Sequence, residues 1–336
     1  MSLLRAELRR LVKRRLTRYL LAVVVAGLAA IAVGTVMASQ QLTPATIAQA
    51  EAKVAVLLKE AQAQHAASVA SCEAAEARGE TGLEQRFGPN CGRAYAPDPD
   101  TFSPQLPFEF DFREQASVMI GLFAGILALF GFLVGASYVG AEWSSGGMTN
   151  LLLWRPARLT VLITKLGVLL GAVLAVALPL GAVWTFAFWL IGRYDGRSAG
   201  VTAGLWRSLA LDGVRGIGLA LAVTAVGFAV ASMGRHTAAA LGAAVAVTAA
   251  SEIGVRMVTT SLNVPYADRY VLSTYARAWL EKRYVLEDWT ACGTDLSACT
   301  VRTSAITWSD SALVLGVGVA AVLVAATWLM RRRDIT

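Results

Sequence analysis

The sequence has few of the residues from which catalytic and metal sites are built. Charged residues make up only 16% of its 336 residues and 56% are hydrophobic, whereas a soluble domain carries about 25% charged residues. It has only two histidines, His65 and His236, which excludes a haem held by paired axial histidines within a membrane. It has no GxxxxGK[ST] phosphate loop and no HExxH motif. We therefore expect no enzymatic activity and no metal or cofactor of the chain's own.

Long apolar stretches dominate the sequence instead. A helix that crosses the hydrocarbon core of a bilayer needs about 20 apolar residues, and inside lipid only a helix or a closed barrel satisfies its own backbone hydrogen bonds. Six stretches qualify as spanning helices: residues 19–38, 116–140, 161–191, 209–233, 237–258 and 311–330. The sequence therefore predicts an all-α polytopic membrane protein, with a six-helix domain over residues 19–336.

The charges between these stretches alternate in sign. Seven Lys/Arg residues and only one acid, Glu7, precede the first stretch, and Arg331, Arg332 and Arg333 follow the last. Residues 40–114 carry eleven acids and six bases. Because cytoplasmic segments of membrane proteins are enriched in Lys and Arg, both termini are predicted to be cytoplasmic. The bases lie at helix ends and not on one folded face, so we expect the lipid bilayer as a partner and no nucleic acid.

Residues 1–18 have the pattern of an amphipathic helix. Leu4, Leu8 and Leu11 recur at helical spacing, with Arg9 and Lys13 opposite them. Such a helix would lie in the cytoplasmic interface of the membrane. A cluster of charges that only sets the topology is the alternative.

Two sizeable loops, 40–114 and 259–310, are predicted to be extracellular. Thr43-Pro44 is a helix start, and we expect a helix from there to about Ala77. In the second loop, aromatic residues at 270, 275, 279, 284 and 289 indicate one or two amphipathic helices at the outer interface or in a cap.

All four cysteines lie in these loops, where the compartment is oxidising. Four cysteines allow three disulfide pairings, and we favour the two bonds within each loop, Cys72–Cys91 and Cys292–Cys299. The alternative to disulfide bonds is a metal site formed by these cysteines, which we favour less.

The most informative segment is GAEWSSGGMTNLLLWRPARLTVLITK, residues 140–165, between the second and third stretches. The acid Glu142 is followed by a Gly-Gly hinge, a short apolar helix ending at Trp154, a turn at Pro156 and the base Lys165. A short exposed helix between a hinge and a rigid turn is typical of a docking element for a soluble partner. The alternative is a connecting loop whose charges only set topology.

This segment resembles the cytoplasmic loop of type-2 ABC exporter permeases. The order Glu142, Gly147, Thr149, Pro156, Arg158 and Lys165 matches that family, although Met148 separates the usual Gly-Thr pair. The turn in GFAVASMGRHTAAALG and the RRRDIT terminus are also similar, whereas the long first outer loop is a departure. The resemblance implies a coupling helix that fits a cleft in a separate ATPase subunit, which binds ATP and Mg. Glu142 would hold the loop against a basic partner, in this chain or on the ATPase.

The resemblance also implies how the chain works. It would be the transmembrane subunit of an ATP-driven exporter in a bacterial plasma membrane, paired with a second permease copy or homologue. The apolar and aromatic lining indicates a lipidic or amphipathic substrate. Glu252 and Arg256, four residues apart in the fifth stretch, are either a functional intramembrane pair or a mutually neutralising pair near the outer end. A different class stays open: a sensor or assembly scaffold that does not transport.

Overall fold

The structure is a computed structural model that describes residues 3–95, 97, 107–154, 157–288 and 301–332. It confirms a largely helical chain with six segments long and apolar enough to cross a membrane. These segments are α2 (Arg15–Ala38), α5 (Phe112–Ser144), α7 (Arg158–Tyr194), α8 (Ala203–Gly234), Thr237–Ser261 and α12 (Trp308–Arg332). The segment Thr237–Ser261 consists of α9 (Thr237–Thr248), a π-helical turn (Ala249–Val255) and α10 (Arg256–Ser261).

The chain divides into two compact units. The first, here the bundle, comprises Met1–Gly34, Asp111–Leu190 and Ser198–Thr336. The second, here the arm, comprises Thr35–Phe110 and Ile191–Arg197. Each is described by itself.

Helices α5 and α8 form the centre of the bundle, and half of the most apolar window of each is buried. Small residues allow them to approach closely. A Cβ atom on Gly135 of α5 would lie 2.8 Å from the carbonyl oxygen of Thr224, and one on Gly227 of α8 would lie 2.7 Å from that of Phe132. Close backbone approach at glycine is how helices associate within lipid. By contrast, only 6% of the corresponding window of α2 is buried, which leaves an apolar surface for lipid.

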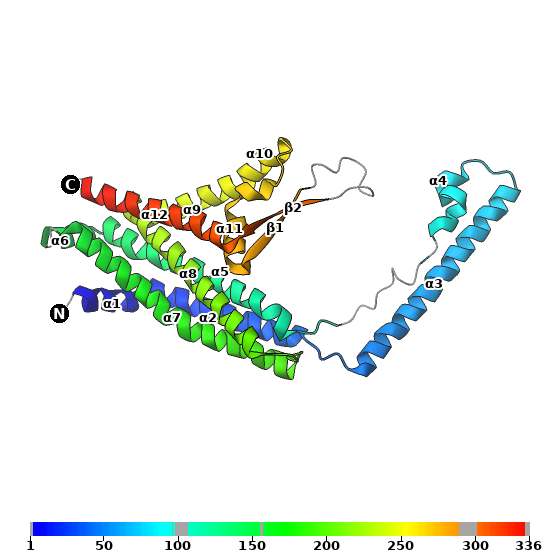
Figure 1. The fold of residues 1–336 in the computed structure, drawn as a ribbon, viewed down its shortest axis with the longest axis horizontal. Helices are drawn as coiled ribbons and strands as arrows, with labels where there is room; N and C mark the ends of the chain where they lie inside the picture. The colour runs from blue at the N-terminus through cyan, green and yellow to red at the C-terminus, as the bar shows by residue number, and fades with distance from the viewer. Residues whose placement is uncertain (1–2, 96, 98–106, 155–156, 289–300, 333–336) are drawn as a thin grey trace. The chain divides into compact units, whose positions relative to one another are not determined.

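One end of the bundle gathers segments that are far apart in the sequence. Helix α1 (Leu3–Lys13), helix α6 (Gly147–Trp154) and the last turns of α12 lie at this same end (Figure 1). Leu11 and Glu7 of α1 are buried against the bundle, whereas Leu4, Leu8 and Val12 are exposed. Helix α1 covers part of the predicted N-terminal helix, and its exposed leucines and valine lie beside its buried residues.

A small substructure of one helix and two strands comes before α12 in the sequence. Helix α11 (Leu272–Glu281) follows a 3₁₀ turn (Ala267–Tyr270) and leads into strand β1 (Arg283–Asp288), which pairs antiparallel with β2 (Arg302–Thr307). Ala278, Leu286 and Ile306 form its core. The prediction of one or two amphipathic helices is therefore only half right. The sequence analysis did not predict the hairpin. In the structure, burial alternates along β1 with the period of a strand.

The arm contains the predicted first-loop helix, α3 (Pro44–Ala77), which ends at Ala77 as expected. The side chain of Thr43 caps it by accepting a hydrogen bond from the backbone of Thr46, and Pro44 occupies its first position. Two short helical segments follow, α4 (Leu83–Phe87) and a 3₁₀ segment (Pro89–Tyr95). A disulfide joins Cys72 to Cys91. This bond confirms one of the two predicted pairs, while Cys292 and Cys299 lie outside the described residues.

We expect non-reducing peptide mapping to recover two linked pairs, Cys72–Cys91 and Cys292–Cys299. The first closes a loop with a sequence separation of 19, and a loop of that size stabilises by about 3 kcal/mol. Cys91→Ser should therefore make the segment after α3 markedly more sensitive to limited proteolysis. Recovery of four free thiols, or of a bond between the two loops, would contradict the assignment.

Candidate functional site

The candidate site lies at the end of the bundle that carries α1 and α6. Helix α5 ends at Ser144, and Gly146 then adopts a φ of +70°, a left-handed conformation that favours glycine. The turn lets α6 begin immediately, with the Asn150 amide donating to the Gly146 carbonyl at 3.0 Å. Met148 is fully buried at the base of α6, whereas Leu153 and Trp154 at its end are 72% and 87% exposed.

A buried ion cluster fastens this loop to its surroundings. The Nζ atom of Lys165, on α7, lies 2.6 Å from Glu142 Oε2 on α5 and 2.6 Å from Glu7 Oε2 on α1. The side chains of Lys165 and Glu7 are completely buried, and that of Glu142 is 15% exposed. Removing one partner of a buried pair leaves an uncompensated charge, which is strongly destabilising. One lysine thus connects α5 and α7, the two helices that flank α6 in the sequence, to α1.

Further groups complete the cluster. The hydroxyl of Tyr138 donates to Glu7 Oε2 at 2.5 Å, and Arg10 lies 3.5 Å from Glu7 Oε1. Arg14, at the break between α1 and α2, donates to the Ser137 carbonyl at 2.9 Å. Its guanidinium lies 5.7 Å from the centre of the Tyr138 ring, and Lys165 Nζ lies 5.0 Å from the same ring. Both carboxylates therefore meet positive charge, as buried ions require.

The charge state of Glu7 follows from these contacts. Burial alone would raise the pKa of its carboxyl group, but hydrogen bonds from Lys165 and Tyr138, with the charges of Lys165 and Arg10, lower the pKa below 4.5. A lowered pKa means that the stabilisation by ionised Glu7 is present at neutral pH and is lost only in acid, as the pH falls through that lowered value. Glu7 is therefore a carboxylate at neutral pH.

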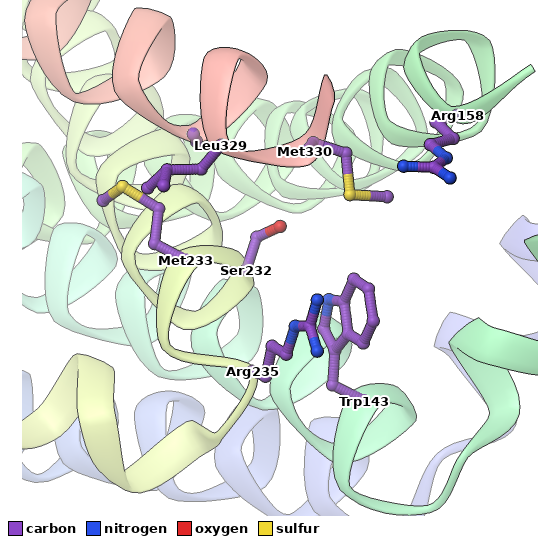
Figure 2. A pocket seen from close by; sticks show the side chains of 8 residues that line it. Trp143, Arg158, Ser232, Met233, Arg235, Leu329 and Met330 are labelled. Atoms are coloured by element: carbon purple, nitrogen blue, oxygen red, sulfur yellow. The ribbon is translucent and has the colours of Figure 1, made fainter. Parts of the chain in front are cut away.

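A shallow pocket lies on another side of the same loop (Figure 2). It is lined by Trp143 at the end of α5, Arg158 at the start of α7, Arg235 in the turn after α8, and Met330 near the end of α12. The guanidinium of Arg235 lies 5.0 Å from the Trp143 ring centre. Residues on either side of α6 therefore share this pocket with residues of α8, of the turn after α8, and of α12.

The structure places the predicted site residues as follows. Glu142 lies in the ion cluster with a partner from its own chain, Lys165. Gly147 begins α6, Thr149 lies within it, Trp154 ends it, and Arg158 begins α7; Pro156 lies outside the described residues.

Glu252 and Arg256, predicted as an intramembrane pair, each contact a residue of another element. Glu252, in the π-helical turn, accepts hydrogen bonds from the Ser273 amide at 3.0 Å and from its hydroxyl at 2.7 Å. Arg256 lies 3.2 Å from Asp268. Both side chains thus connect the fifth span to the segment around α11.

Sequence reasoning missed two features. Glu7 is the only acid before the first span, and that isolation among seven bases was the signal for a specific partner. A second cluster, around Asp212 of α8, was also missed. Asp212 is nearly buried and lies 3.1 Å from Lys282 and 3.3 Å from Arg215, so it fastens the end of α11 to α8.

The ion cluster is an electrostatic contact between α1, α5 and α7. Within the described part of the chain, no three His, Cys, Asp or Glu side chains gather closely enough to hold a metal ion. Comparisons with protein-family models, curated proteins and solved structures found no match.

Proposed function

We propose that this chain is the membrane-spanning subunit of an ATP-driven exporter and that α6 is its docking helix for a separate ATPase subunit. The observation that carries the proposal is the Lys165 ion cluster. A helix that transmits force must be exposed at its contact surface and firmly joined to the elements it moves. Helix α6 exposes Leu153 and Trp154, and Lys165 joins both of its flanking helices to α1.

The cycle follows from these connections. ATP-driven closure of two ATPase subunits would displace α6 in each of two permease copies. Because Lys165 is on α7 and its partners are on α5 and α1, that displacement reaches three helices together. It would open an outward path for a lipidic or amphipathic substrate, which suits the apolar surfaces of the spans. Helix α1, with its exposed apolar strip and basic face, would lie in the cytoplasmic interface of the bacterial plasma membrane.

The topology in this proposal has its own test. We expect reporter fusions at Thr336 and before Leu3 to show cytoplasmic activity, and a fusion after residue 80 to show extracellular exposure. The physical reason is the excess of bases at both ends of the chain and of acids in residues 40–114. The reverse pattern of activity would place α6 outside the cell and would contradict ATPase docking.

Co-purification tests the function itself. The full chain, extracted from its native membrane with mild detergent, should bring with it a protein containing a GxxxxGK[ST] loop, and the eluate should hydrolyse ATP. Mass spectrometry identifies the partner. A histidine kinase in the eluate, with no such ATPase, would favour the second candidate, a sensor or scaffold whose outer segments bind a ligand.

A further inference from the structure

A cavity of about 280 Å³ lies under the corner where α1 turns into α2. Its walls come from four helices: Leu8 and Val12 on α1, Arg18 on α2, Phe130 on α5, and Val173 on α7. Apart from Thr17 and Arg18, its lining side chains are hydrocarbon. The cavity is partly open to its surroundings, and its apolar lining offers water too few polar partners.

We propose that this cavity binds an acyl chain of an anionic phospholipid, with the lipid phosphate at Arg18. The volume suits a stretch of hydrocarbon chain, and the position beside the interfacial helix suits a lipid of the leaflet in which α1 lies. This inference rests on the membrane location of the bundle and needs no ATPase.

Charge selects an anionic headgroup. Arg18 lines the cavity and is exposed, and among the described residues its guanidinium donates to the Lys13 carbonyl, at 3.4 Å. The only acid in residues 1–38 is Glu7, and its carboxylate is already neutralised by Lys165 and Arg10. Each base near the surface of an anionic leaflet contributes about 1 kcal/mol, so a phosphate at Arg18 meets unopposed positive charge.

The site is continuous with the ion cluster. Leu11, which lines the cavity, is one helical turn from Glu7, and Val134 is one turn from Tyr138. A bound chain would therefore cover the apolar side of the Glu7–Lys165 contact and hold α1 against the bundle. The lipid thereby becomes a regulator of the contact between α1 and the helices that flank α6.

Native mass spectrometry of the full chain in detergent, titrated with phosphatidylglycerol and separately with phosphatidylcholine, tests the proposal. Wild-type protein should retain phosphatidylglycerol preferentially. Arg18→Glu should weaken its binding by about 30-fold, because one favourable charge is lost and an unfavourable one gained, each worth about 1 kcal/mol. Arg9→Glu is the matched control, since Arg9 is an exposed base of α1 that does not line the cavity, and it should bind as wild type does.

A second pair of variants tests the acyl chain. Ala172→Phe fills the cavity and should reduce retention of phosphatidylglycerol, while Ala182→Phe, at an exposed position of α7 outside the lining, should not. Equal binding by Arg18→Glu and Arg9→Glu, or equal retention of the two lipids by wild type, would overturn the proposal. So would a change of oligomeric state in Ala172→Phe without loss of lipid, since a second copy of the chain would then fill the cavity.

Discussion

Lys165→Ala is expected to destabilise the bundle by about 3–5 kcal/mol, the largest effect of any single substitution proposed here. The substitution leaves the carboxylates of Glu7 and Glu142 without the ammonium group that lies 2.6 Å from each. The two carboxylates then have to change conformation or become protonated, or α1 has to move away from α5. Thermal unfolding in detergent measures the loss, which should lower the transition temperature by roughly 10 °C.

A matched control and a rescue make this expectation specific. Lys59→Ala removes an exposed lysine from α3 and should change the transition temperature little. Adding Glu7→Gln to Lys165→Ala removes one uncompensated charge and should recover part of the loss, giving a measurable interaction term in a double-mutant cycle. Strictly additive effects, or a Lys165→Ala protein as stable as Lys59→Ala, would show that the cluster does not stabilise this end of the bundle.

Trp154→Ala should weaken ATPase binding by about 30-fold. Buried aromatic anchors dominate interface energies, and truncating one costs about 2 kcal/mol or more, which corresponds to that change in Kd. Trp154 is the largest apolar side chain of α6 and is 87% exposed in the free chain. Substrate-stimulated ATP hydrolysis by the reconstituted complex should fall, as should recovery of the ATPase subunit in a pull-down.

The control for this substitution is Trp328→Ala. Trp328 is also an exposed tryptophan, 50% accessible on α12, but it lies within a spanning segment and would contact lipid. Glu142→Ala should share the loss of hydrolysis because it releases the end of α5 from Lys165. If Trp154→Ala retains wild-type assembly and hydrolysis, α6 is not a docking helix and the sensor hypothesis gains ground.

Local sequence patterns were sufficient for the spanning helices and for α3. A run of about 20 apolar residues permits few alternatives in lipid, and Thr43-Pro44 combines a cap with a residue suited to the first helical position. The helix ends were less predictable. Helix α5 extends to Phe112 and Ser144, beyond the expected 116–140, because polar turns at both ends continue the helix outside the apolar run.

The sequence could not show which residues pair in the ion cluster because its members are distant along the chain. Glu7 and Lys165 are 158 positions apart, and only the packing of α1 against α5 and α7 brings them together. The partners of Glu252 and Arg256 were likewise set by packing, since Ser273 and Asp268 belong to a segment that folds back beside the fifth span. The β1–β2 hairpin was missed because its strands are short and part of the connecting segment is polar.

Site-specific photo-crosslinking from position 154 tests the central claim most directly. A photoreactive residue replaces Trp154 in the full chain in its native membrane, and the adduct is identified by mass spectrometry, with position 183 on α7 as a control. Val183 is exposed within a spanning segment and should contact lipid. We predict an adduct at position 154 with a protein that carries a GxxxxGK[ST] loop, and none at position 183. An adduct at position 154 only with proteins that lack such a loop would contradict the proposal.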